Sequence, residues 1–167
     1  MGEIADLSGQ LQLTAALTLT DNTPEKAKVD LSSTFSFPLN LAFGTGASQA
    51  NKQIQDSISV ANGAPVSIDL EDGTEEDSFG GDFDANNIKG LIIYHKASSS
   101  ASSIDLSGSF ITARLNTMSL APGEWIAVGK PAAGWPVAAA TNEVVTFTNP
   151  DASNNADIQY LFIGDDA

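Results

Sequence analysis

Ile88-Lys89-Gly90-Leu91-Ile92-Ile93-Tyr94 is the most apolar short run of this chain. It is too short for a buried helix, and β-branched residues recur in it. A strand that is apolar on both faces is expected inside a sheet rather than at its edge. We therefore predict that this run is a central strand.

Runs on both sides of it alternate apolar and polar residues. The pattern is clearest over 11–20, and it returns over 35–43 and 54–60. A period of two places alternate side chains on opposite faces of a strand, whereas an amphipathic helix needs spacings of three and four. Because Pro38 has no N–H to donate, the 35–43 run is expected to be an edge strand or to contain a bulge.

Turn signals separate further short runs of the same kind. Asn62-Gly63 favours a tight turn, and Ala121-Pro122-Gly123-Glu124 has the residues that a type II turn requires. Helical periodicity is scarce, although a turn of helix over 51–57 is an alternative. The remaining strands are expected over 29–31, 65–70, 104–110, 125–128, 144–148 and 158–164, and 134–137 is expected to be a loop or the start of a strand.

These strands predict an all-β fold: an antiparallel β-sandwich, jelly-roll-like, with an N-terminal β arm. The segment Phe43-Gly-Thr-Gly-Ala-Ser-Gln-Ala-Asn-Lys52 lies between two patterns of different character. We expect residues 1–43 to be the arm, which serves in assembly, and residues 44–167 to be the sandwich domain.

The charge of the chain excludes some classes of partner. Its 167 residues carry 21 acidic and 7 basic side chains, a formal net charge of -14. Nucleic-acid binding requires clustered Lys and Arg, and here the basic residues are scattered, so neither nucleic acid nor an anionic membrane is expected as a partner. The absence of cysteine excludes disulfides and zinc sites built on Cys. No signal peptide is expected, because the first residues lack a basic and then an apolar segment.

Residues that could carry chemistry are few. His95 is the only histidine, and without a nucleophile-elbow motif we expect it at the surface or the rim of a strand. The acidic residues between Asp69 and Asp84 could bind calcium or supply a glycosidase pair, or they could form a solvated loop. The best local fit to a calcium loop, 82–87, fails because Asn87 stands where glycine is needed and Ile93 where glutamate is needed.

Two further motifs have ordinary interpretations. Gly123 to Lys130 resembles a phosphate loop only superficially, because it has one residue too many between its glycines and Pro131 follows. Trp125 and Trp135 could form a platform for a sugar, or they could be anchors of the core or of an interface. We therefore predict no catalytic, cofactor-binding or metal-binding residue and no enzymatic activity.

An ordered set of short motifs runs along the chain and begins at Gly44-Thr-Gly-Ala-Ser-Gln-Ala50. The other motifs are Ser67-Ile-Asp69-Leu70, Lys89-Gly-Leu91-Ile-Ile93, Pro122-Gly123, Gly134-Trp-Pro-Val137 and Tyr160-Leu-Phe-Ile-Gly164. Together they resemble a family of small virion-associated β proteins of tailed bacteriophages, commonly encoded beside the major capsid gene. The chain departs from the family in its acidic loop, 71–84, and at Ile54, where an aromatic residue is common.

The resemblance implies a virion structural protein without a known active site. The role it favours is a capsid decoration, or cement, protein that bridges major capsid subunits on the capsid surface after synthesis in the host cytoplasm. The expected partners are the major capsid protein and further copies of this chain, with a trimer favoured over a dimer. A tail, neck or fibre-base protein and a carbohydrate-binding module for host attachment are the alternatives.

Overall fold

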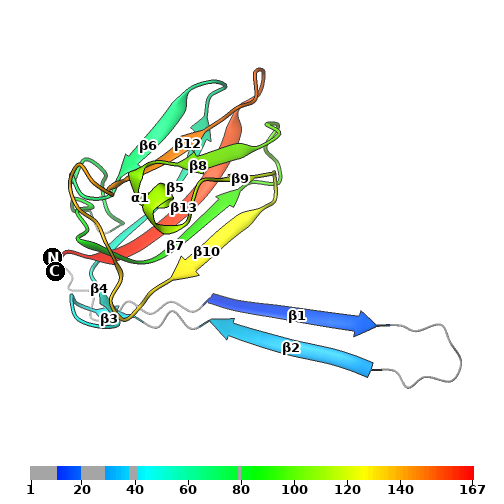
Figure 1. The fold of residues 1–167 in the computed structure, drawn as a ribbon, viewed down its shortest axis with the longest axis horizontal. Helices are drawn as coiled ribbons and strands as arrows, with labels where there is room; N and C mark the ends of the chain where they lie inside the picture. The colour runs from blue at the N-terminus through cyan, green and yellow to red at the C-terminus, as the bar shows by residue number, and fades with distance from the viewer. Residues whose placement is uncertain (1–10, 20–28, 38–40, 79) are drawn as a thin grey trace, which may run out of the picture.

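The fold is all-β, and its two larger sheets are antiparallel (Figure 1). The computed structural model describes residues 11–19, 29–37, 41–78 and 80–167, with side chains described from residue 41 onward. In the first large sheet the strand order is β10 (Trp125–Gly129), β7 (Asn87–His95), β13 (Ala156–Asp165), β5 (Lys52–Val60). The short strand β11 (Trp135–Pro136) also pairs with β7. The prediction of a central strand over 88–94 is confirmed, since β7 pairs with β10 on one side and β13 on the other.

The second large sheet completes the sandwich. Its strand order is β6 (Pro65–Asp69), β12 (Val144–Thr148), β8 (Ile104–Ser107), β9 (Met118–Leu120). From β5 to β13, successive strands pass between the two sheets except at β8 and β9, which are neighbours in the second sheet, and at β10 and β11, which both pair with β7 in the first. A five-stranded and a four-stranded antiparallel sheet packed in this way form a β-sandwich, and a jelly roll is one class of such sandwiches. The assignment to that class stays a prediction.

The core lies between the two sheets and is filled from both. The alternation of buried and exposed residues on β12 and β13 points Phe147 and Phe162 into it, and both are fully buried. The Tyr160 ring packs between them, with its centroid 5.9 Å from that of Phe147 and 5.3 Å from that of Phe162. Burial of an aromatic or aliphatic side chain of this size contributes about 1.5–3 kcal/mol, so this cluster holds the sheets together.

The sequence prediction was wrong over 104–110. Strand β8 ends at Ser107, and α1 (Ser109–Arg114) follows it. Gly108 separates the two elements with a φ of +94°, which takes the backbone out of the extended conformation. Phe110 and Ile111 are buried from adjacent positions of this short helix, which is too short to produce a helical period in the sequence. The alternative of a helical turn over 51–57 is also wrong, because that segment belongs to β5.

The segment 43–52 is a compact loop tied to the sandwich. Strand β3 (Ala42–Phe43) pairs in parallel with β4 (Gln49–Ala50). The Ser48 N–H donates to the Pro131 carbonyl at 3.1 Å, and the Asn51 N–H donates to the Gly164 carbonyl at 3.1 Å. Leu41 and Ala50 are buried against Ile163. These contacts fix the start of the sandwich to the end of its last strand.

A separate two-stranded sheet precedes this loop. Strand β1 (Leu11–Leu19) pairs antiparallel with β2 (Val29–Phe37), and Figure 1 shows the pair extending away from the sandwich. Among the described strands, neither β1 nor β2 pairs with a strand of the sandwich. The proposed bulge or edge at Pro38 lies outside the described residues. The boundary between an arm and a body at residue 43 stays a prediction.

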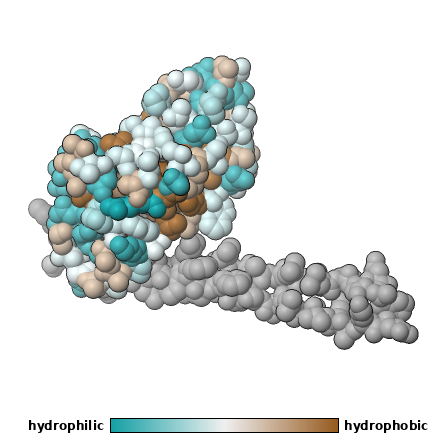
Figure 2. Space-filling model, in the orientation of Figure 1, coloured by the Kyte–Doolittle hydropathy of each residue, from teal (hydrophilic) through white to brown (hydrophobic). Residues whose placement is uncertain are grey.

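The surface of the sandwich is predominantly hydrophilic in the view of Figure 2, where hydrophobic side chains gather in the middle of the body. Two large hydrophobic side chains among the described residues stand out by exposure: Phe43 at 42% and Trp125 at 48%. In the part of the chain that the structure describes, no helix is long and apolar enough to cross a membrane.

Candidate functional site

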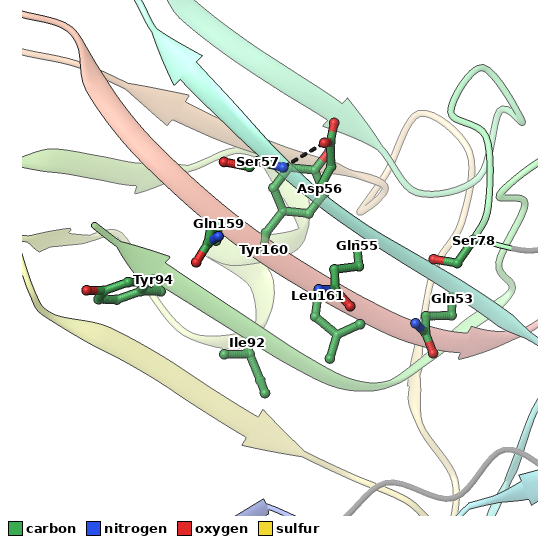
Figure 3. A pocket seen from close by; sticks show the side chains of 10 residues that line it. All are labelled: Gln53, Gln55, Asp56, Ser57, Ser78, Ile92, Tyr94, Gln159, Tyr160 and Leu161. Atoms are coloured by element: carbon green, nitrogen blue, oxygen red, sulfur yellow. Dashed lines mark hydrogen bonds between the residues drawn. The ribbon is translucent and has the colours of Figure 1, made fainter. Parts of the chain in front are cut away.

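A shallow groove lies along the first sheet, with a volume of about 620 Å³. Figure 3 shows its side chains arranged along three adjacent strands, β5, β13 and β7, with Ser78 on a neighbouring loop. It is lined by Gln53, Gln55, Asp56, Ser57, Ser78, Ile92, Tyr94, Gln159, Tyr160 and Leu161.

The strand period explains which residues reach this groove. On β13, Ile158, Tyr160 and Phe162 are buried, so Gln159 and Leu161 belong to the opposite face of the sheet. We call this opposite face the outer face. The register places three residues side by side in each row across it. One row contains Tyr94, Gln159 and Ser57, and the next contains Ile92, Leu161 and Gln55.

The two rows of the groove contain no charged side chain, although the chain has a net charge of -14. The adjoining row of the outer face contains Asp157, which pairs with Ser59. Charged groups reach the groove at its border. The Lys96 ammonium donates to the Ser57 hydroxyl at 2.6 Å, which uses one of its protons. Asp56 lies two residues after Ile54 on β5 and therefore on the side of the strand opposite Gln55 and Ser57. Its carboxylate accepts a hydrogen bond from the Ser57 N–H at 2.6 Å (Figure 3). Amides and hydroxyls therefore supply the polar groups at the centre of the groove, each able to donate and to accept hydrogen bonds.

Trp125 extends the first row from Tyr94 onto β10, where the row ends in two aromatic residues. Trp125 is the cross-strand partner of Tyr94 and is about half exposed. The Tyr94 hydroxyl accepts a hydrogen bond from the Ala97 N–H at 3.1 Å, which restrains the position of its ring. The expectation that Trp125 and Trp135 might form one platform is wrong. Trp135 pairs with Ile88 near the other end of β7 and packs against the core.

Tyr160 contributes to the groove from the core side of β13. Burial raises the pKa of its phenol above the usual range, and the negative charges of Asp56 and Glu75 raise it further. A buried phenolate is disfavoured for both reasons, so the native state holds the neutral side chain.

We expect this to make the fold sensitive to alkali. As the pH rises above about 10, Tyr160 ionises in the unfolded chain but not in the native state, so the free energy of unfolding falls. Below pH 10 both states hold the proton and the contribution of this group is constant. Urea titrations give the free energy of unfolding at each pH from 8.5 to 11. Over this range it should decrease less for Tyr160→Phe than for the natural chain. Equal slopes would show that Tyr160 does not cause the sensitivity.

His95 is not at the surface or at a rim, as its position in the sequence suggested, but fully buried. Its Nδ1–H donates to the Leu120 carbonyl at 2.9 Å, since that oxygen can only accept. Its Nε2 is buried and has no hydrogen-bond partner among the described residues. The structure places His95 inside the sandwich, where its hydrogen bond joins β7 to β9.

The acidic residues of the 69–84 segment are spread along its turns. Asp69 accepts from the N–H groups of Glu71 and Asp72, and Asp72 accepts from Thr74. Phe83 is fully buried and anchors this segment to the core. Within the described ranges, no group of three or more His, Asp or Glu side chains could hold a metal ion.

The residues at 123–130 form a turn and a strand. Gly123 lies in the turn with a φ of +88°, and 125–129 form β10. Sequence reasoning missed the groove, although the polar positions of its strands were visible. A signal was present in the alternation that places Gln53, Gln55 and Ser57 opposite the apolar set of β5.

No protein-family model, curated protein or solved structure matches this chain.

Proposed function

We propose that this protein is a structural component of a bacteriophage virion, a capsid decoration protein that attaches through its β1–β2 hairpin. The single observation that supports attachment is the pairing within that hairpin. The register pairs Leu11 with Phe37, Leu13 with Phe35, Leu17 with Leu31 and Leu19 with Val29. Three of the intervening pairs are polar: Gln12 with Ser36, Thr14 with Thr34 and Thr18 with Asp30.

A hairpin with this distribution requires a partner. An isolated two-stranded sheet is at best marginally stable in water. The apolar pairs fall on alternate positions, so they form one apolar set that gains free energy when another surface covers it. Each strand also has one edge that does not pair within the hairpin, and such an edge can accept a strand from another chain.

The resemblance to small virion proteins of tailed phages supports the identity of the partner. Its matching motifs lie in the 43–52 loop, at strands β6, β7, β11 and β13 of the sandwich, and in the turn before β10. A rigid sandwich and a net charge of -14 suit a protein that covers a particle and stays soluble at high concentration. We propose the major capsid protein as the partner, together with further copies of this chain in a trimer.

Charge introduced into the apolar set of the hairpin should prevent attachment. We expect Leu13→Asp with Leu17→Asp to weaken binding to capsids by about a hundredfold or more, because each leucine contributes about 1.5–3 kcal/mol when covered. Gln12→Asp with Thr14→Asp, in the polar set of the same strand, is the matched control and should bind normally.

The measurement is cosedimentation with capsids from the phage or prophage that carries this sequence, after removal of any native copy of the protein. Light scattering after size exclusion gives the oligomeric state of each variant. Normal capsid binding by the leucine variant would exclude the hairpin as the attachment site. Binding of the natural chain to purified tails and not to heads would exclude capsid decoration.

A further inference from the structure

We propose that the groove on the outer face is a binding site for a neutral oligosaccharide. The site comprises the exposed Trp125, the restrained Tyr94 and the amides of Gln159, Gln55 and Gln53. This is a second activity beside capsid attachment, and it involves a different surface from the hairpin.

The aromatic pair is suited to a sugar ring. Pyranose rings present C–H groups on one face, and an aromatic ring is a flat partner for such a face. Trp125 is 48% exposed although it is one of the largest apolar side chains of the chain. The cross-strand register places it beside Tyr94, so the two rings begin one row at the edge of the sheet.

The polar side chains of the groove are suited to sugar hydroxyls. A hydroxyl donates one hydrogen bond and accepts two, and a glutamine amide offers both functions on adjacent atoms. Gln159 continues the row from Tyr94, and Gln55 lies in the next row on β5. The side-chain amides of Gln53, Gln55 and Gln159 form no hydrogen bond with any other residue that the structure describes, so they are available to a ligand.

The dimensions and charge of the surface narrow the class of ligand. The row from Trp125 to Ser57 crosses four strands, which is about 14 Å and accommodates a short oligosaccharide. The groove is open and shallow, unlike the enclosed apolar cavities that take drug-sized molecules. An acidic glycan would meet the negative field of a chain of net charge -14, with Lys96 already bonded to Ser57.

The experiment uses the full-length chain on an array of neutral, sialylated and sulfated oligosaccharides. We expect binding to a subset of the neutral ones. Titration calorimetry with the best neutral ligand should then give about tenfold weaker binding for Trp125→Ala and for Gln159→Ala. Phe43→Ala is the matched control, because Phe43 is a similarly exposed aromatic outside the outer face, and it should bind normally.

Other outcomes would overturn the proposal. No binding to any neutral oligosaccharide at millimolar concentration would remove it, as would binding to acidic glycans alone. Unchanged affinity in both Trp125→Ala and Gln159→Ala would place the ligand elsewhere. A change in oligomeric state of Trp125→Ala, without glycan binding by the natural chain, would identify the outer face as a protein interface. The Leu13→Asp, Leu17→Asp variant should retain glycan binding, which separates this proposal from capsid attachment.

Discussion

Replacing Lys89 with methionine is expected to destabilise the fold by about 3–5 kcal/mol, because it leaves a buried carboxylate without its counter-charge. The Lys89 ammonium lies 2.7 Å from Oδ2 of Asp165, and the two side chains are 4% and 1% exposed. The Asn87 amide and the Ala167 N–H donate to the other carboxylate oxygen at 2.8 Å and 3.5 Å, and these neutral donors alone cannot compensate a buried negative charge. Urea denaturation of the natural chain and the variant measures the difference.

Two further variants test the cause. Lys52 forms an ion pair with Asp166 at 3.8 Å, and these side chains are 17% and 38% exposed. Lys52→Met is therefore the matched control, and it should cost about 1 kcal/mol or less because water screens the pair. The double variant Lys89→Met, Asp165→Leu removes both charges and should recover most of the lost stability. A Lys89→Met variant as stable as the Lys52→Met control would contradict the prediction.

Replacing Gly108 with alanine is expected to cost about 3 kcal/mol or more, because two separate penalties apply at this position. The φ of +94° is one that residues with a side chain rarely adopt. The added Cβ would also lie 2.4 Å from the Val144 carbonyl oxygen and 2.9 Å from the Thr146 nitrogen. Both are backbone atoms of β12, so the clash cannot be relieved by moving a flexible side chain.

Gly63 provides the control for the first penalty. Its φ is +68°, and a Cβ there would meet nothing within 4 Å. Gly63→Ala should therefore cost about 1–2 kcal/mol, the cost of the backbone conformation alone. Thermal and urea unfolding measure how much each variant is destabilised. The extra destabilisation of Gly108→Ala over Gly63→Ala is the cost of the clash with β12. Equal destabilisation of the two variants would show that this contact relaxes without cost.

The regular strands could be predicted because their signal is local. The apolar run at 88–94 and the alternation over 144–148 and 158–164 appear in the sequence, and the structure forms β7, β12 and β13 there. The helix α1 was missed because six residues complete fewer than two turns and carry no measurable period. The short strand β9 was missed for a similar reason, since three residues cannot establish an alternation.

The candidate site could not be assembled from the sequence. Tyr94, Gln159 and Ser57 are far apart in the chain, and they meet only because β13 pairs with β7 and β5 in one register. A shift by one residue would move every groove side chain to the core face. The hydrophobic pattern of each strand indicates which residues share a face, but it does not identify the neighbouring strand.

The all-β class, the position of most strands and the negative charge can be read from the sequence alone, because alternation and composition are properties of short segments or of the whole chain. The environments of individual polar residues depend on tertiary packing. His95 and Lys89 both belong to β7, yet one is buried with a single hydrogen bond and the other with an ion pair. Those environments depend on Leu120 and Asp165, which lie beside β7 only because distant strands pack against it. A local sequence pattern does not predict that packing.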